Sequence, residues 1–295
     1  MRILGNATYR QGKNTSYQRH LAIAQRCSGQ NLLKPTTVEY VGILNGKNIV
    51  ITGVLTEASL AFGVAQLAQQ EGATIVLTGA GRGLSITQRA AKKLDSPVEV
   101  VEFDVTVEEH TVTARQEIQK ILGRVDGVLH SIGFAPAACL GDDFMAATWQ
   151  DVSTAMHISA YSLKTLADAF VPLMTSGGTI VGLDFDNTVA WPAYNWMGVA
   201  KSALESTNRY LAKALGPKNI RCNLIAAGPI RTMAAKSIPS FSAFEDIWSD
   251  RAPLGWDVNN SAPVARSAVA LLGDWFPATT GEIIHVDGGF HSTGA

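Results

Sequence analysis

Short apolar runs that alternate with segments of helical periodicity are the feature that most constrains the fold of this chain. Seven such runs of five to seven residues occur from Leu44 onward. Strands of a parallel sheet are apolar along their whole length, because helices cover both faces of the sheet. Right-handed crossovers between such strands give a doubly wound parallel sheet in a single α/β domain. The predicted strands are residues 47–53, 74–78, 98–103, 127–133, 179–183, 220–225 and 282–286.

The segments between these runs place apolar residues on one side of a helix. In the first segment, Leu60, Val64 and Leu67 share such a side. Another segment begins with Glu108 and Glu109, and a helix dipole favours acidic residues in the first turn. The predicted helices are residues 58–71, 84–94, 108–122, 151–174 and 194–215.

Small and polar residues recur where the predicted strands end. Ligands of doubly wound folds bind beyond the carboxyl ends of the strands, so these positions are candidates for a binding site. They are Gly53, Gly79, Asp104, Ser131-Ile132-Gly133, Asp184-Phe185 and Ala226-Ala227-Gly228-Pro229.

Residues 1–41 differ from the rest of the chain in composition. The first 38 residues contain six basic side chains and no acidic one. No apolar core followed by a small-residue cleavage site is present, which argues against a secretory signal. The simplest interpretation is a basic, disordered extension ahead of a domain over residues 42–295. A transit peptide is the alternative interpretation.

The composition of the whole chain excludes several classes of protein. The chain contains 24 basic and 25 acidic residues, so beyond the basic extension it is acidic, with a net charge of −7. An acidic domain argues against nucleic acid as a partner. No apolar run reaches the length of about 18 residues that indicates a membrane span. The three scattered cysteines predict neither disulfides nor a metal site and suit a cytoplasmic protein.

Two titratable side chains, Tyr194 and Lys201, lie seven positions apart at the start of the predicted helix 194–215. Seven residues make about two helical turns, so both side chains project from one face. A phenol there can donate a hydrogen bond to a developing oxyanion, while a nearby cation keeps the field favourable. The same spacing also occurs by chance on ordinary amphipathic helices, so the pair alone leaves both interpretations open.

The turn after the first strand matches a dinucleotide-binding fingerprint only in part. Gly53 stands at the first glycine position, but the later small residues are Ser59 and Ala61. Backbone amides and the Ser59 hydroxyl at a helix start could still bind a pyrophosphate. No acidic residue follows the second strand to bind a ribose, and Arg82 there could accept a 2′-phosphate. By this logic the choice between NADH and NADPH stays open, and Asp104 is either an adenine ligand or a turn residue.

Six segments together resemble the NADH-dependent enoyl-acyl-carrier-protein reductases, a divergent branch of the short-chain dehydrogenase/reductase superfamily with a Rossmann fold. The likeness runs from about residue 42 to residue 290, and its mycobacterial branch is the most similar. The segment around Tyr194 and Lys201 is the most specific. The segments are residues 52–61, 129–133, 157–162, 192–205, 226–232 and 280–289.

The resemblance implies a role for each matched position. Tyr194 would hydrogen-bond the thioester carbonyl of a trans-2-enoyl substrate, and Lys201 would bind the nicotinamide ribose. Phe185 would stand beside the reacting double bond, and Met197 would line the acyl pocket. The remaining cofactor-binding residues would be Gly53, Val54, Leu55, Ser59, Leu60, Asp104, Val105, Ser131, Ile132, Gly133, Ile230 and Thr232.

The resemblance also implies partners and an assembly. The cofactor would be NADH rather than NADPH, the substrate would be carried on acyl carrier protein or coenzyme A, and the protein would be a homotetramer. Two departures from the family pattern stand out. The segment 233–250 is short for a substrate loop, although Phe241, Phe244, Ile247 and Trp248 predict an amphipathic lid helix there. Gly81 stands where the mycobacterial branch has an acidic residue near the adenosine.

Two other functions remain as alternatives. A short-chain alcohol dehydrogenase or ketoreductase would need Tyr-x3-Lys, but position 198 is a glycine. A non-catalytic dinucleotide sensor would be expected to lose Tyr194 or Lys201, and both are present. We interpret His130 and His157 as packed structural histidines, and Cys139 and Cys222 as buried apolar residues.

Overall fold

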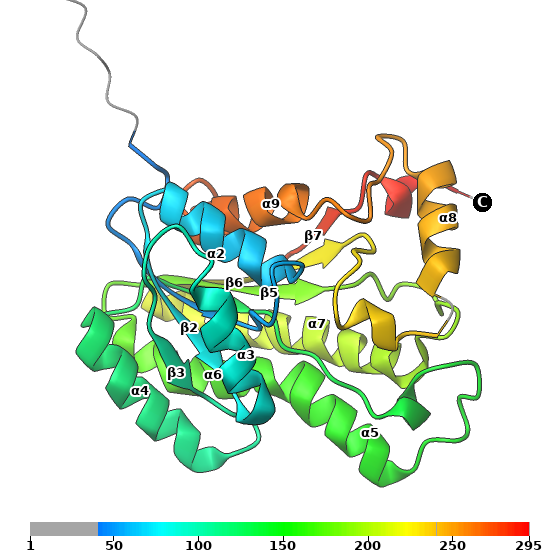
Figure 1. Cartoon of the computed structure of the whole chain (residues 1–295), viewed down its shortest axis with the longest axis horizontal. Helices are drawn as coiled ribbons and strands as arrows, with labels where there is room; N and C mark the ends of the chain where they lie inside the picture. Colours follow the sequence, from blue (N-terminus) through cyan, green and yellow to red (C-terminus); the bar gives the residue numbers. More distant parts are fainter. Residues whose placement is uncertain (1–40, 240, 295) are drawn as a thin grey trace, which may run out of the picture. The chain divides into compact units, whose positions relative to one another are not determined.

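The computed structural model describes residues 41–239 and 241–294, and the expectations for residues 1–40 lie outside this part of the chain. Seven strands form one sheet in the order β3-β2-β1-β4-β5-β6-β7, and every neighbouring pair is parallel. The doubly wound fold predicted from the apolar runs is therefore confirmed (Figure 1). The strands are β1 (Asn48–Thr52), β2 (Thr74–Gly79), β3 (Val100–Glu102), β4 (Gly127–His130), β5 (Gly178–Asp184), β6 (Ile220–Ala227) and β7 (Ile283–Val286).

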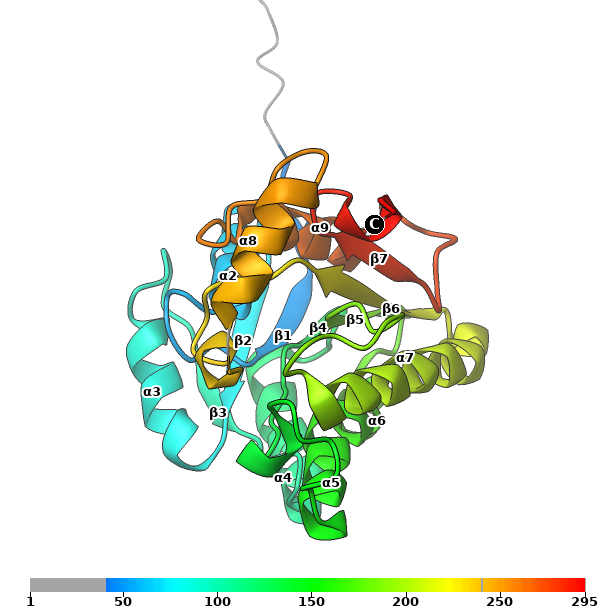
Figure 2. The ribbon, with the colours of Figure 1, turned by 90° about the vertical axis from the view of Figure 1, so that its right-hand side faces the viewer.

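Helices cover both faces of the sheet, and each face has its own hydrophobic core (Figures 1 and 2). One core joins the sheet to α2 (Leu60–Gln70), α3 (Gly81–Ala91) and α9 (Ala262–Leu272). The other joins it to α4 (Glu108–Leu122), α6 (Ser162–Phe170) and α7 (Asn195–Leu215). Alternate residues of β1 show the division, because Ile49 and Ile51 belong to the first core and Val50 to the second.

The predicted helix over residues 151–174 is three segments in the structure. It comprises α5 (Trp149–Met156), a π-helical segment (His157–Tyr161) and α6, and a short 3-10 turn (Val171–Leu173) follows. The Ser162 hydroxyl donates to the Ile158 carbonyl and lies 2.7 Å from Nε2 of the buried His130. The change in helical geometry thus coincides with a polar contact to β4, which helical periodicity cannot reveal.

Two helices follow β6 before the chain returns to the sheet. The lid helix predicted from the aromatic spacing is present as α8 (Phe241–Arg251). It stands near the C-terminal end of the described chain, and the Arg251 guanidinium donates to the Thr293 and Gly294 carbonyls (Figures 1 and 2). The sequence did not predict α9, whose buried side is made of Val264, Ala268 and other small apolar residues.

Among the described residues, no helix is both long and apolar enough to cross a bilayer. No group of three or more His, Cys, Asp or Glu side chains in this part of the chain could hold a metal ion. Cys139 and Cys222 are both fully buried, as predicted.

Candidate active site

The strand order places the predicted site residues at one edge of the sheet. The chain winds outward from β1 through β2 to β3, and then outward from β4 through to β7 on the other side. The adjacent carboxyl ends of β1 and β4 are therefore the switch point, where doubly wound folds bind ligands. Gly53 follows β1 there, Ser131 follows β4, and Asp184 ends the neighbouring strand β5.

Tyr194 immediately precedes the first residue of α7 and is held in an unusual piece of backbone. Its neighbours Ala193 and Asn195 have φ values of 56° and 49°, in the left-handed region that side chains other than glycine rarely adopt. Such backbone strain costs free energy and persists only where surrounding contacts impose it. The junction between β5 and α7 is thus shaped around Tyr194.

Hydrogen bonds to the loop after β4 impose this conformation. The Asn195 side-chain amide donates to the carbonyls of Gly141 and Asp143 at 3.0 and 3.1 Å. The Gly141 backbone N–H donates to the Ala193 carbonyl at 2.9 Å. Asn195 had no predicted role, although asparagine is one of the few residues that accept left-handed φ values.

The Tyr194 side chain is 7% exposed and packs against Phe185, with ring centroids 5.1 Å apart. Burial raises the pKa of its phenol above the ordinary value, and the nearby Asp184 carboxylate raises it further. The phenol therefore stays protonated at neutral pH and can act as a hydrogen-bond donor. A cavity of about 620 Å³ adjoins this junction and is bordered by Phe144, Trp191, Tyr194 and Val199 among others. Its size is that of a small-molecule site.

Lys201 lies two turns further along α7 and is also buried, with 8% exposure. Its ammonium donates to the Leu183 carbonyl at 2.9 Å and lies 3.7 Å from Oδ1 of Asp184. Burial lowers the pKa of Lys201, while the Asp184 carboxylate opposes that change. Lys201 therefore faces the end of β5, and Tyr194 packs on Phe185, the residue that follows β5; the helix predicted from residue 194 begins at Asn195, so Tyr194 lies just outside it.

An aromatic cluster covers Phe185 on the side of the lid helix. We define it as Phe185, Trp191, Phe244, Trp248 and Phe290. Phe185 lies 5.6 to 5.9 Å, between ring centroids, from Trp191, Phe244 and Trp248. Phe290 comes from the C-terminal segment and stacks on Trp248 at 3.9 Å. Phe185, Phe244 and Trp248 were expected in this region, whereas Phe290 was not.

The turn after β1 is held by Gly53 and Ser59, two of the residues expected to bind the cofactor phosphates. Gly53 has a φ of 79°, and a Cβ atom there would lie 1.9 Å from the Ser131 carbonyl oxygen, so only glycine fits. The Ser59 hydroxyl accepts from the backbone N–H groups of Leu55 and Thr56 at 3.1 and 2.8 Å. It therefore shapes the turn that leads into α2. The backbone at Gly53 thus packs directly against the start of the loop after β4.

The other residues proposed for cofactor binding lie at the same edge of the sheet. Ser131 is anchored by its N–H, which donates to the Thr52 hydroxyl at 2.9 Å. Asp104 accepts from both the N–H and the hydroxyl of Thr106, at 2.9 and 2.6 Å, which describes the turn role that sequence analysis left open. Ile230 and Thr232 follow β6, which is hydrogen-bonded to β5. Val54 and Val105 are buried, Leu55 is exposed, and Leu60 and Ile132 are half-buried.

Two histidines differ in their surroundings. His130 is fully buried at the end of β4, and its burial, with the Lys201 charge, lowers its pKa to about 3. It is therefore a neutral, packed histidine, as predicted. His157 is half-buried in the π-helical segment, where its ring meets Tyr161 edge-on at 5.8 Å.

Comparison with known proteins agrees with this arrangement. A family model described as "Enoyl-(Acyl carrier protein) reductase" matches residues 53–291. The chain is 48% identical to an NADH enoyl-acyl-carrier-protein reductase of Mycolicibacterium smegmatis over 262 residues, which cover 84% of this chain and 97% of that protein. It is 46% identical to the corresponding NADH enzyme of Mycobacterium avium, over 84% of this chain and 97% of the relative.

A relative of lower sequence identity is named for a different cofactor. The enoyl-acyl-carrier-protein reductase of Staphylococcus aureus, named for NADPH, is 39% identical over 84% of this chain and 98% of its own length. The matches span both the dinucleotide turn and the segment with Tyr194 and Lys201. The chain therefore belongs to the enoyl-acyl-carrier-protein reductase family.

Proposed function

We propose that this protein reduces trans-2-enoyl thioesters, carried on acyl carrier protein or coenzyme A, to saturated acyl thioesters with NADH. This reaction is the final reductive step of the type II fatty acid elongation cycle. The convergence of Tyr194, Lys201 and Phe185 at the end of β5, beside the switch point, carries the proposal. Family membership supports the same reaction.

Tyr194 is the proposed electrophilic residue. When bound, NADH supplies a hydride to the β-carbon of the enoyl group. Negative charge then develops on the thioester carbonyl oxygen as the enolate forms, and Tyr194 donates a hydrogen bond to that oxygen. Its raised pKa keeps the donor proton on the phenol throughout the neutral range. A proton added at the α-carbon completes the saturated product.

Lys201 and the strand ends are proposed to hold the cofactor. The Lys201 ammonium would bind the nicotinamide ribose hydroxyls, and it has only one close carbonyl partner, Leu183, among the described residues. The turn at Gly53 and the start of α2 would hold the pyrophosphate, with Val54, Leu55, Ser59 and Leu60 around it. Asp104 and Val105 would flank the adenine. Ser131, Ile132, Gly133, Ile230 and Thr232 would line the nicotinamide side.

The cofactor choice follows the mycobacterial relatives, which are named for NADH. No carboxylate follows β2 to bind a ribose 2′-hydroxyl, and the exposed Arg82 lies in the first turn of α3 instead. NADPH is the less favoured cofactor because both mycobacterial relatives are named for NADH, although Arg82 could accept a 2′-phosphate.

Three further expectations belong to this proposal. The substrate carrier is acyl carrier protein, the assembly is a homotetramer, and the compartment is the cytoplasm. The family resemblance supports the first two, and the scattered cysteines support the third.

A spectrophotometric assay of NADH oxidation tests the function. A trans-2-enoyl-coenzyme A should be turned over, whereas a 3-ketoacyl-coenzyme A should not. Turnover of the 3-ketoacyl substrate with none of the enoyl substrate would show a ketoreductase and overturn the proposal. NADPH in place of NADH, with the enoyl substrate, measures the cofactor preference in the same experiment.

A further inference from the structure

Asp184 is a buried acidic residue to which the proposed mechanism gives no role. It is the last residue of β5 and pairs with Ala226 of β6 in the central part of the sheet. Its exposure is 6%, and no hydrogen bond of ordinary length and angle reaches either carboxylate oxygen from the described residues. A buried carboxylate without hydrogen bonds is costly unless an opposite charge compensates it.

Lys201 is the opposite charge that faces it. The ammonium lies 3.7 Å from Oδ1 of Asp184, beyond hydrogen-bond distance, while it gives a hydrogen bond to the carbonyl of the preceding residue, Leu183. The ammonium is thus held at the end of β5 by a carbonyl and a carboxylate together. Its remaining N–H groups can reach a ligand at this edge of the sheet.

We propose that Asp184 is a positioning residue of the cofactor site, whose buried carboxylate keeps the Lys201 ammonium charged where it meets the nicotinamide ribose. The inference rests on the proposed function, because it requires that Lys201 bind the cofactor. Asp184 itself touches neither cofactor nor substrate in this role. It acts only through Lys201.

The ionisation of the pair supports this role. Burial raises the pKa of Asp184 to about 7 and lowers that of Lys201, and the attraction between the two groups opposes both changes. Other titratable groups influence the pair from α7 and β4. The Glu205 charge raises the pKa of Asp184. The Asp184 charge raises the pKa of Tyr194, and the Lys201 charge lowers the pKa of His130. The next ion pair, Asp186 with His285 at 3.6 Å, belongs to the loop after β5 and to β7.

Removing the Asp184 charge should therefore discharge Lys201 at a lower pH. Burial already lowers the pKa of this lysine. Without a carboxylate nearby the pKa falls further, so the lysine loses its proton at a lower pH. As the pH is raised, NADH binding would then weaken at a lower pH than in the wild type. An opposite charge within 4 to 6 Å typically changes a pKa by about 1 to 3 units, so the alkaline limb should move down by about one pH unit or more.

The test is NADH affinity of the apoprotein, measured by fluorescence titration across the pH range, for the wild type and Asp184→Asn. Asparagine has nearly the shape of aspartate but no charge. Glu205→Gln is the matched control, because it makes the same chemical change on α7 at a carboxylate that accepts from Asn187 at 2.7 Å instead of pairing with Lys201. The alkaline limb of this control should stay near the wild-type pH, because burial and Asp184, not Glu205, change the pKa of Lys201.

If NADH affinity falls at the same alkaline pH in Asp184→Asn as in the wild type, the inference is overturned. If that variant does not fold, Asp184→Glu decides the question, because it keeps the charge and must keep the limb near the wild-type pH. A limb about one unit lower in Asp184→Glu would equally contradict the inference. Lys201→Met separates the two proposals. Unchanged NADH affinity in this variant would refute the cofactor role of Lys201. Weakened affinity in Lys201→Met, together with no change in the alkaline pH dependence of Asp184→Asn, would refute only the inference about Asp184.

Discussion

Tyr194, just before α7, and Lys201, within α7, are both buried, but their partners differ. The Tyr194 ring packs on Phe185, next to the aromatic cluster and a cavity. The Lys201 ammonium lies between the Leu183 carbonyl and Asp184, at the edge of the sheet. The first environment suits a donor to the substrate, and the second suits a cation that holds the cofactor.

This division predicts that substitutions at the two residues affect different steps. Tyr194→Phe should lower kcat by roughly 10²- to 10³-fold, the usual effect of removing one donor to a developing oxyanion, and should leave NADH affinity nearly unchanged. Lys201→Ala should weaken NADH binding far more. Steady-state kinetics with an NADH titration by fluorescence measures both effects. Equal NADH affinity in the two variants would contradict the assigned roles.

Some helices and strands could be predicted from sequence patterns, and others could not. The helix α8 could be predicted, because its aromatic residues recur at helical spacing. That spacing places them on one side of a helix, which then packs against the protein. The π-helical segment and the left-handed backbone at Ala193 and Asn195 could not be predicted. Both depend on contacts with distant residues, His130 in one case and Gly141 in the other. Likewise, Phe290 joins the aromatic cluster only because β7 returns the chain to β6.

The aromatic cluster leads to a prediction about acyl chain length. We propose that an acyl chain held by its carbonyl at Tyr194 runs past Phe185 toward the rings of Trp248 and Phe290, which pack beside Phe185. Phe290→Ala should open space there and move the optimum of kcat/KM toward longer acyl chains. Loss of this buried ring should also cost about 3 to 5 kcal/mol of unfolding free energy. A chain-length series of enoyl-coenzyme A substrates and urea unfolding measure the two effects.

Phe276→Ala is the control for this prediction, because Phe276 is 40% exposed and lies outside the cluster. It should change neither the chain-length optimum nor the stability by a comparable amount. An unchanged optimum in a folded Phe290→Ala protein would show that the acyl chain does not pass this ring.

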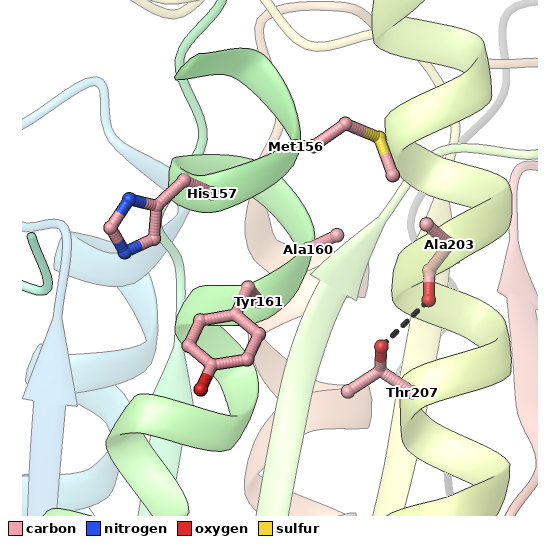
Figure 3. Close-up of a pocket in the computed structure, with 6 residues that line it drawn as sticks. All are labelled: Met156, His157, Ala160, Tyr161, Ala203 and Thr207. Atoms are coloured by element: carbon pink, nitrogen blue, oxygen red, sulfur yellow. Dashed lines mark hydrogen bonds between the residues drawn. The ribbon is translucent and has the colours of Figure 1, made fainter. Parts of the chain in front are cut away.

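At the scale of the whole molecule, the parallel sheet and the place of the site followed from the sequence because both depend on a repeating pattern. Apolar runs predicted buried strands, and the rule for strand ends then predicted which residues gather at one edge. The proposed assembly is a different matter, since it depends on surfaces. A groove of about 500 Å³ runs between the π-helical segment and α7, with Met156 and Ala160 on one wall and Ala203 and Thr207 on the other (Figure 3).

If the proposed homotetramer uses this face, a charge in the groove should disrupt it. Ala203→Glu places a carboxylate among largely apolar side chains and should shift the assembly from about four times the 31.4 kDa chain mass to smaller species. Light scattering coupled to size-exclusion chromatography measures the mass. A tetrameric Ala203→Glu protein would show that this face is not an interface, and a monomeric wild type would refute the tetramer.

Hydride from NADH is proposed to reach the β-carbon of an enoyl thioester, and transfer of a deuterium label reports this step. NADH that carries deuterium on the transferred C4 position is incubated with the protein and a trans-2-enoyl-coenzyme A, and the product is analysed by mass spectrometry and NMR. The account predicts a saturated acyl thioester with one deuterium at C3. No deuterated saturated product, together with a deuterated 3-hydroxyacyl thioester formed from a 3-ketoacyl substrate, would contradict it.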